Sequence, residues 1–307
     1  MHDAALTAAC DAVLPFQVDR LGVRGRMVRL CDAAAPLMIE GRYPDAVRAL
    51  ALDTLALTAL LASTLKYEGV FSLQIQGDGP ISLLVADASS EGALRAYAKY
   101  NAEALNEIGA AAGDPPAKLV GTGQMAFTVD QGPDTERYQG ITELSGATLA
   151  ECASAYFRQS EQLDTAIVGA RAKSQVAGQA AAAALLVQRL PAKERDEDEA
   201  SEAWREAAVL AGTASEAELL DATLAPENLL YRLYHESGIR TFEPQPLRFA
   251  CRCSHDRVSR TLASFPKDEI ESFRVDGEVV VTCEFCGTEY TFDDPALEAV
   301  FTLSATA

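Results

Sequence analysis

Four cysteines near the C-terminal end of the chain have the spacing of a metal-binding site. They form two tight pairs, Cys251-Arg252-Cys253 and Cys283-Glu284-Phe285-Cys286, and each pair follows an extended, β-prone run. Two such thiolate pairs can be brought together around one tetrahedral Zn²⁺, which then acts as the core of a domain too small to fold alone. The sequence therefore predicts that Cys251, Cys253, Cys283 and Cys286 bind zinc, with one ion per chain.

The same sulfurs could also respond to oxidants. Bound zinc keeps its sulfur ligands as thiolates, and the thiolate is the form that oxidants attack. Within each pair the sulfurs are close enough for a sulfenic acid to be resolved into a disulfide, which would remove two ligands and eject the metal. Because metal binding and folding are coupled in such a module, metal loss should unfold it. An inert structural zinc ribbon remains an alternative, although a CxC pair is unusual in purely structural sites.

A thiol–disulfide oxidoreductase is a further alternative, from a different functional class. In thioredoxin-like enzymes the CxxC motif stands at a helix N-terminus, which lowers the pKa of the reactive thiol. Here Cys286 is followed by residues 287–292, which have the pattern of a strand. We therefore predict no catalytic residues and do not expect an enzyme.

Composition limits the partners and the compartment. The chain has 307 residues, a formal net charge of -19 and 49% hydrophobic residues, enough for one large domain and a smaller one. An acidic chain is repelled by phosphate backbones and anionic membranes, so we expect neither nucleic-acid nor membrane binding. The first 14 residues do not resemble a signal peptide. We expect a cytoplasmic protein, in which paired cysteines indicate metal or redox chemistry.

Hydrophobic patterning before residue 191 predicts a body rich in strands. The turn at residues 77–80 lacks the lysine and the following helix of a phosphate-binding loop, so a hairpin turn is favoured. Residues 166–190 are ambiguous, because alanines favour helix whereas Gly169 and Gly178 weaken it. The expected helices are 45–66 and 146–159, and the expected strands are 16–19, 23–30, 71–76, 81–87, 94–100, 118–130 and 136–144, the last two joined by a turn at 131–134.

A highly charged segment follows this body. The run at 192–201 leads into an amphipathic helical pattern around Trp204 and then a short helix that begins near Pro226. We call residues 192–240 the connector. Its charge run is typical of a solvated helix face, but its few apolar anchors also fit a segment of low local stability. Trp204, Tyr231 and Tyr234 would pack against the body, and would be exposed if the connector unfolded.

The remaining candidate residues have plainer interpretations. His255 is too close to Cys253 to be needed as a ligand beside four cysteines, so we expect a surface residue. Cys10, Cys31 and Cys152 are isolated in the sequence and are expected to be small buried side chains. Between the two cysteine pairs we expect a helix at 254–264 and two strands, 273–275 and 279–281, around the turn Asp276-Gly277.

Several motifs together make the whole chain resemble the heat shock protein 33 family, the redox-regulated holdase chaperones of bacteria. The most specific are the cysteine pairs with the residues around them. The motifs are Phe242-Glu243-Pro244-Gln245-Pro246, Cys251-Arg252-Cys253-Ser254, Cys283-Glu284-Phe285-Cys286, Tyr290, Phe292-Asp293, Gly77-Asp78-Gly79-Pro80, Arg95-Ala96-Tyr97-Ala98, Tyr138-Gln139-Gly140, Tyr156-Phe157 and Ser160-Glu161-Gln162.

The resemblance implies a fold and its division. The fold is α+β: a sheet-rich N-terminal domain with packed helices, a helical linker, and a small zinc-binding domain. The boundaries would be 1–191 for the core and client-binding domain, 192–240 for the redox-sensitive linker, and 241–307 for the redox-switch domain. In this family the ambiguous stretch 166–190 is rich in strands.

The resemblance also implies a mechanism. The reduced protein would bind zinc and be inactive. The oxidised protein would act as an ATP-independent holdase that binds unfolding clients during oxidative stress. Oxidation would pair Cys251 with Cys253 and Cys283 with Cys286, release the zinc, unfold the linker and produce a homodimer. The identity of the clients and the oxidant sensed do not follow from the sequence.

Overall fold

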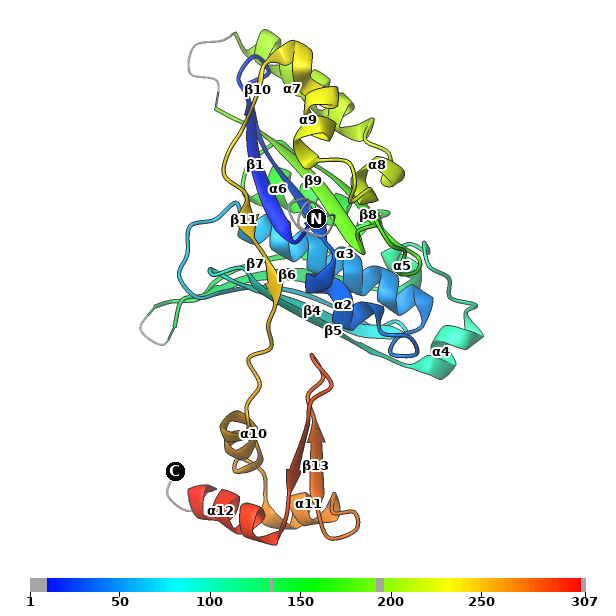
Figure 1. Ribbon diagram of the computed structural model, residues 1–307, viewed down its shortest axis with the longest axis vertical. Helices are drawn as coiled ribbons and strands as arrows, with labels where there is room; N and C mark the ends of the chain where they lie inside the picture. The colour runs from blue at the N-terminus through cyan, green and yellow to red at the C-terminus, as the bar shows by residue number, and fades with distance from the viewer. Residues whose placement is uncertain (1–9, 133–134, 192–195, 305–307) are drawn as a thin grey trace, which may run out of the picture. The chain divides into compact units, whose positions relative to one another are not determined.

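The structure is a computed structural model that describes residues 10–132, 135–191 and 196–304 (Figure 1). The chain divides into two compact units, residues 1–249 and residues 250–307. Parts of the turn expected at 131–134 and of the charge run that begins at residue 192 lie outside the described residues, as does most of the segment examined for a signal peptide. Among the residues that are described, no helix combines the length and apolar character needed to cross a membrane.

The first unit contains a sheet formed by both ends of its sequence. Its strands run in the spatial order β10-β1-β2-β9-β8, all neighbours are antiparallel, and β11 also pairs with β1. The strands are β1 (Ala12–Val18), β2 (Val23–Leu30), β8 (Thr165–Arg171), β9 (Ala182–Arg189), β10 (Ile239–Thr241) and β11 (Gln245–Pro246).

A second sheet lies in the same unit, with the order β12-β5-β4-β3-β6-β7. Its pairs are antiparallel except for β12, which runs parallel to β5. The strands are β3 (Val70–Gly77), β4 (Ile81–Ser89), β5 (Ala93–Tyr100), β6 (Gly123–Asp130), β7 (Tyr138–Glu143) and β12 (Arg248–Phe249).

Helix α3 (Asp45–Ala62) packs against strands of both sheets. Pro44 precedes it and Asp45 lies in its first turn, both favourable at a helix N-terminus. Nearly all its side chains are buried, because both sheets cover it, and they join the larger apolar core. The remaining helices of this part are η1 (Asp32–Ala34), α2 (Ala35–Met38), α4 (Ala102–Glu107), α5 (Pro116–Leu119) and α6 (Leu149–Ser160).

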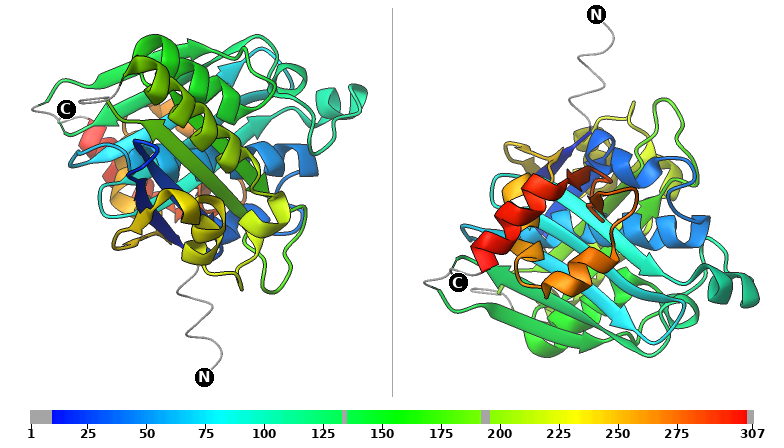
Figure 2. Two further views of the ribbon diagram at one scale, coloured as in Figure 1. Left: turned by 90° about the horizontal axis from the view of Figure 1, so that it is seen from above. Right: turned by 90° about the horizontal axis from the view of Figure 1, so that it is seen from below.

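The connector forms helices that cover the other face of the first sheet (Figure 2, left). Apolar side chains of α7 and α9 meet residues of β1, β2 and β9 in a second core. Tyr234 is fully buried there, and its hydroxyl donates a hydrogen bond to the carbonyl of Ala207 over 3.0 Å. The elements are α7 (Glu197–Gly212), α8 (Glu216–Leu220), α9 (Pro226–Tyr234) and η2 (His235–Ser237).

The structure confirms the α+β fold class and most expected elements. The alanine-rich stretch forms the antiparallel pair β8–β9, as the family resemblance implied. Strand β9 lies between β2 and β8 and is buried along almost its whole length, so tertiary burial overrides the helix propensity of alanine. The strand expected from residue 118 is wrong at its start, because residues 116–119 form helix α5 and β6 begins at Gly123.

The second unit is small. Its core consists of Ile270, Val279, Phe292, Leu297 and Val300, with a few partly buried neighbours. The expected strand at 273–275 is wrong: only Val275 makes a bridge, to Glu278, and Val279–Thr282 pairs with the segment after Cys286. The elements are α10 (His255–Leu262), α11 (Lys267–Ser272), β13 (Val279–Thr282), β14 (Glu289–Phe292) and α12 (Asp294–Ser304).

Candidate metal centre

The first cysteine pair stands in a short irregular segment just before helix α10. Cys251 and Cys253 are both partly buried. Ser254 follows them in an extended conformation, and its side chain accepts a hydrogen bond from the N–H of Arg257, which caps the helix. Arg257 in turn donates from its side chain to the carbonyl of Arg252 over 3.0 Å. The helix start therefore fixes the backbone between the two cysteines.

The second pair lies in the turn between β13 and β14. The N–H of Cys283 donates to the carbonyl of Thr288 over 2.9 Å, and the N–H of Gly287 donates to the carbonyl of Cys283 over 2.8 Å. Gly287 has a φ of 74°, a conformation in which glycine is favoured because it has no Cβ. These bonds close a tight knuckle that turns both sulfurs to the same side.

The four cysteines converge on one point. All four sulfurs lie within 4.8 Å of one another; Cys251 and Cys283 are 3.7 Å apart, and Cys253 and Cys286 are 3.4 Å apart. A tetrahedral site with metal–sulfur bonds of about 2.3 Å has sulfur–sulfur edges of about 3.8 Å. The donor set and its spacing therefore fit a tetrahedral metal ion.

The surroundings of the sulfurs shift their pKa values in different directions. Burial raises the pKa of Cys253 to about 12, opposed by a hydrogen bond from Tyr290. Burial also raises the pKa of Cys283, in part offset by the N–H groups of Cys286 and Phe285. For Cys286, burial is outweighed by hydrogen bonds from Thr288 and from the neighbouring thiols, which lower its pKa to about 6. Cys286 is therefore the sulfur most readily present as a thiolate among these three.

His255 takes no part in this cluster. It is exposed, its ring stacks on Phe292 with 4.7 Å between ring centroids, and its Nδ1 lies 3.3 Å from the hydroxyl of Ser259. The expectation of a surface residue is confirmed.

Of the three other cysteines, one is a free thiol and two are joined in a disulfide. Cys152 is fully buried in the larger core, as expected. The interpretation of Cys10 and Cys31 as isolated residues is wrong, because they form a disulfide with an S–S distance of 1.99 Å. The β1–β2 ladder pairs Ala12 with Arg29, so two further steps outward bring Cys10 opposite Cys31. Pairing the two expected strands 16–19 and 23–30 as a hairpin, and extending their register, could have found this disulfide.

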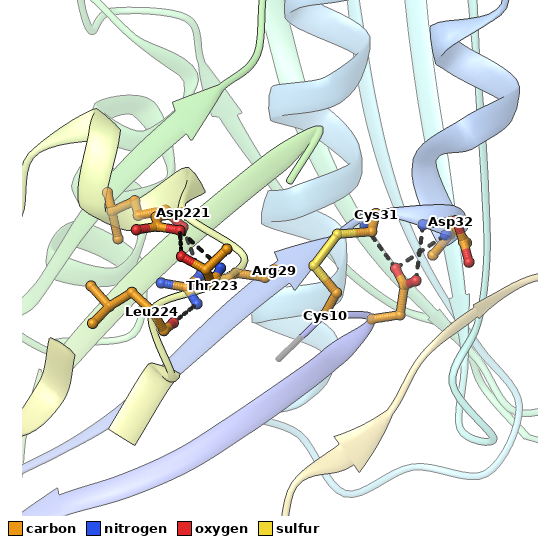
Figure 3. Close-up of a disulfide and its surroundings, with 10 residues drawn as sticks. Cys10, Arg29, Cys31, Asp32, Asp221, Thr223 and Leu224 are labelled. Carbon is orange, nitrogen blue, oxygen red and sulfur yellow. Dashed lines mark hydrogen bonds between the residues drawn. A yellow bond between two sulfur atoms is a disulfide. The ribbon is translucent and has the colours of Figure 1, made fainter. Parts of the chain in front are cut away.

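The buried Arg29 is a second feature that sequence reasoning missed. Its guanidinium donates to the carbonyl oxygens of Glu218, Leu219 and Leu224, at 2.8 Å for Glu218 and 2.7 Å for Leu219. Burial lowers the pKa of Arg29 to about 10, although the negative charges of Asp221 and Glu227 oppose this shift. It thereby fastens strand β2 to the end of α8 and the loop that follows (Figure 3).

Of the three connector aromatics that were expected to pack against the body, Tyr234 is buried and Trp204 partly buried, but Tyr231 is 62% exposed.

Comparison with known proteins gives a consistent result. The model of the family described as Hsp33 protein matches residues 11–293. A 33 kDa chaperonin of Caulobacter vibrioides is 40% identical over 290 residues, covering 93% of this chain and 95% of that protein. A 33 kDa chaperonin of Ectopseudomonas mendocina is 39% identical over 288 residues, covering 93% of each.

A solved structure shows the same fold. The crystal structure of a 33 kDa chaperonin, a heat shock protein 33 homologue from Thermotoga maritima, superposes with a TM-score of 0.74 at 21% identity, covering 97% of this chain and all of that one. The match of the family model over most of the sequence, and the identity to relatives over nearly their full length, show that this chain belongs to the Hsp33 family of chaperones.

Proposed function

We propose that the protein is a redox-regulated, ATP-independent holdase that binds unfolding proteins during oxidative stress in the cytoplasm. It would act by binding, without catalysis, on clients rather than nucleic acids or membranes. The observation that carries the proposal is the convergence of Cys251, Cys253, Cys283 and Cys286 in a unit with a very small apolar core.

In the reduced state the four sulfurs would hold one Zn²⁺ per chain. Tetrahedral sites of four thiolates suit zinc, and the ion supplies a cross-link between the two cysteine pairs. Cys251 and Cys253 precede α10, whereas Cys283 and Cys286 join β13 to β14. Joining these segments would stabilise the second unit far more than its core can.

Oxidation would dismantle this site. A peroxide oxidises one thiolate to a sulfenic acid, and a neighbouring thiol displaces water to form a disulfide, so two thiols lose two electrons for each peroxide reduced. We propose the pairs Cys251–Cys253 and Cys283–Cys286. All four sulfurs lie within 4.8 Å, so pairs between the two motifs are also sterically accessible. Peptide mapping of the oxidised chain by mass spectrometry distinguishes the two pairings.

The connector would transmit the change. We propose the division 1–191 for the client-binding domain, 192–240 for the linker and 241–307 for the switch, whose metal-binding part is the compact unit that begins at Ala250. The covalent path from the connector to this unit passes through residues 241–249, which pair with both sheets of the first unit. Unfolding of the connector would uncover the apolar face on which α7 and α9 pack, and two such faces could associate in a homodimer.

The test compares the full-length protein in two redox states. Light scattering of a thermally unfolding client is measured with zinc-loaded reduced protein and with peroxide-oxidised protein, while released zinc is followed with a chromogenic chelator. We expect suppression of scattering only after oxidation, with zinc release before or together with it. Equal suppression by both states, or none by either, would refute the redox switch.

A thiol–disulfide oxidoreductase is a weaker interpretation. Cys286 is followed by strand β14 and not by a helix. The helix N-terminus that activates the thiol of thioredoxin-like enzymes is therefore lacking at this motif.

A further inference from the structure

The Cys10–Cys31 disulfide lies at the open end of the β1–β2 hairpin, in the first unit (Figure 3). Cys10 is 8% exposed and belongs to the core between the first sheet and the connector helices, and the partly buried Cys31 packs against that core. The bond therefore joins two strand ends on the sheet face that the connector covers.

Asp11, between Cys10 and the start of β1, connects this pair to its neighbours. Its carboxylate accepts hydrogen bonds from the N–H groups of Cys31, Asp32 and Ala33, over 2.8, 2.9 and 3.0 Å. Its own N–H donates to the carbonyl of Arg29 over 2.8 Å. Asp11 has a φ of 52°, which non-glycine residues rarely adopt and which these bonds must maintain.

The chain that leads to the metal centre is attached at the same residue. The N–H of Leu247 donates to the carbonyl of Asp11 over 2.7 Å, directly after strand β11 pairs with Ala12 and Val13. Leu247 lies four residues before Cys251. Loosening the start of β1 would therefore loosen the last residues of the first unit as well.

The connector is attached to the other strand of this hairpin end. Arg29 stands two residues before Cys31, so the two side chains leave the same face of the strand. Its guanidinium holds the carbonyls of Glu218, Leu219 and Leu224. Both the α8 end of the connector and the segment after the connector are thus anchored to the strand ends that the disulfide joins.

The disulfide borders a cavity of about 700 Å³, a volume large enough to hold a small oxidant or a dithiol. The cavity is lined by both cysteines and, among others, by Met38, Val176, Ala222 and Leu247. Residues of the connector and of the segment before the metal centre therefore form part of its wall.

We propose that Cys10 and Cys31 are a second redox-active pair, whose disulfide clamps the anchoring points of the connector and of residues 245–247. Peroxide oxidises one thiol to a sulfenic acid, and the other thiol displaces water to close the S–S bond. A dithiol reopens it through a mixed disulfide and is itself oxidised to a disulfide.

This clamp gives oxidation two opposite effects, an inference that rests on the proposed redox switch. At the metal centre, oxidation removes ligands and loosens the second unit. At Cys10–Cys31 it fastens the sheet from which the connector must separate. The pair would therefore keep the client-binding sheet folded and hold residues 216–224 on it while the rest of the connector opens.

The first measurement establishes the redox response. The full chain with the four cluster cysteines replaced by serine is treated with hydrogen peroxide, then with dithiothreitol, and its thiols are counted by differential alkylation and mass spectrometry. The thiol of Cys152 is the internal reference for alkylation, since it lies fully buried in the larger core. We expect Cys10 and Cys31 to be linked after peroxide and alkylated after dithiothreitol. Two free thiols after peroxide, or a bond that dithiothreitol leaves intact, would overturn the proposal.

The second measurement is hydrogen–deuterium exchange of the same protein in both redox states. We expect peroxide to slow exchange at least threefold in peptides that cover 216–224 and 243–249. A further Cys10→Ser/Cys31→Ser change should exchange like the reduced form under both conditions, and the single Cys31→Ser variant serves if the double variant misfolds. Unchanged exchange in both segments would overturn the clamp. Because the cluster cysteines are absent here, this result is independent of the light-scattering test of the redox switch.

Discussion

The two units of this chain rest on very different amounts of apolar burial. The first has two extended cores, one around helix α3 between its sheets and one under the connector. The second has a core of Ile270, Val279, Phe292, Leu297 and Val300, with short elements around it. Domains of this small size rarely fold on a hydrophobic core alone and usually need a metal or disulfides.

This difference suggests how one chemical event could act on one part of the molecule and spare the other. A unit whose stability came from four sulfur ligands would unfold when an oxidant removed them, whereas the folding of a unit with buried sheets and helices does not depend on such ligands. The predictions below test this contrast, from the largest expected effect to the smallest.

The largest effect is expected from loss of a ligand. Cys283→Ser should leave three thiolates and abolish stable folding of the second unit, because the binding free energy of a structural zinc is about 10–16 kcal/mol. The part of the first unit that lies outside the connector should stay protected from exchange. Metal content, measured by mass spectrometry of the purified protein, and hydrogen–deuterium exchange of peptides from each unit check both statements.

The matched control for this change is Glu278→Gln, an exposed residue in the turn before β13. It should leave metal content and exchange unchanged. A metal-free Cys283→Ser protein whose residues 279–292 stay protected would show that the core alone holds the unit, and the contrast would be wrong.

Replacing a buried phenylalanine with alanine should have different consequences in the two units. Phe16 and Phe292 are both fully buried, and replacing a buried Phe with Ala costs about 3–5 kcal/mol. If folding of the second unit is coupled to metal binding as proposed, Phe292→Ala should weaken metal affinity by roughly two to three orders of magnitude. Phe16→Ala should lower the unfolding free energy of the first unit without changing metal affinity. Competition with a chelator of known affinity and denaturant unfolding measure the two quantities.

These variants are each other's control. A similar loss of metal affinity in both would mean that the two units fold as one cooperative block, contrary to the separate cores seen here.

A smaller and more local effect is expected at Arg29. Replacement by Met retains the apolar stem but leaves the carbonyls of Glu218, Leu219 and Leu224 without their donor. Since unsatisfied buried polar groups cost about 1–3 kcal/mol each, local opening of the connector should become easier by about 3 kcal/mol, or roughly 100-fold in exchange rate. Hydrogen–deuterium exchange of residues 216–224 measures this.

Arg24→Met is the control on the same strand, because the Nε of Arg24 donates to the side chain of Gln188 and not to the connector. Faster exchange of residues 216–224 in both variants would assign the effect to strand β2 in general.

Local spacing was sufficient to predict the cysteine cluster and insufficient to predict the Cys10–Cys31 disulfide or the role of Arg29. Cys251, Cys253, Cys283 and Cys286 are recognisable because the ligands come in two short motifs, each of which a turn can position. Cys10 and Cys31 are separated by 21 positions and come together only through the register of β1 with β2. Arg29 could not be singled out, because its partners are backbone carbonyls about 190 residues away.

The failed strand at 273–275 has a similar cause. Residues around Asp276-Gly277 do form a tight turn, but Val275 and Glu278 make only a single bridge. The knuckle at Cys283–Cys286 sends the chain back along β13, so β14 occupies the pairing edge that the sequence assigned to Phe273–Val275. Competition between two possible partners for one strand is a tertiary effect that alternation of residues does not resolve.

The smallest effect is expected in the first unit, as a dependence on pH whose sign should be opposite to that in the second unit. In the first unit, burial raises the pKa of Asp53 from 3.8 to about 6, although Arg171 lies 2.6 Å away and opposes the shift. Between these two pKa values the folded state binds a proton that the unfolded state lacks, so the unfolding free energy falls as pH rises through this window. Between pH 5 and pH 7 the loss should be about 1 kcal/mol. Asp53→Asn should remove it, whereas Asp45→Asn, on the exposed first turn of the same helix, should not.

In the second unit the sign should reverse. Metal binding requires deprotonated sulfur, and burial raises the pKa of Cys253 to about 12 and raises that of Cys283. Metal affinity, and with it the stability of this unit, should therefore increase over the same range in which the first unit weakens. Denaturant unfolding of zinc-loaded protein at pH 5, 6 and 7, followed separately by exchange of peptides from each unit, measures both slopes. Slopes of the same sign would mean that the metal does not dominate the stability of residues 250–307.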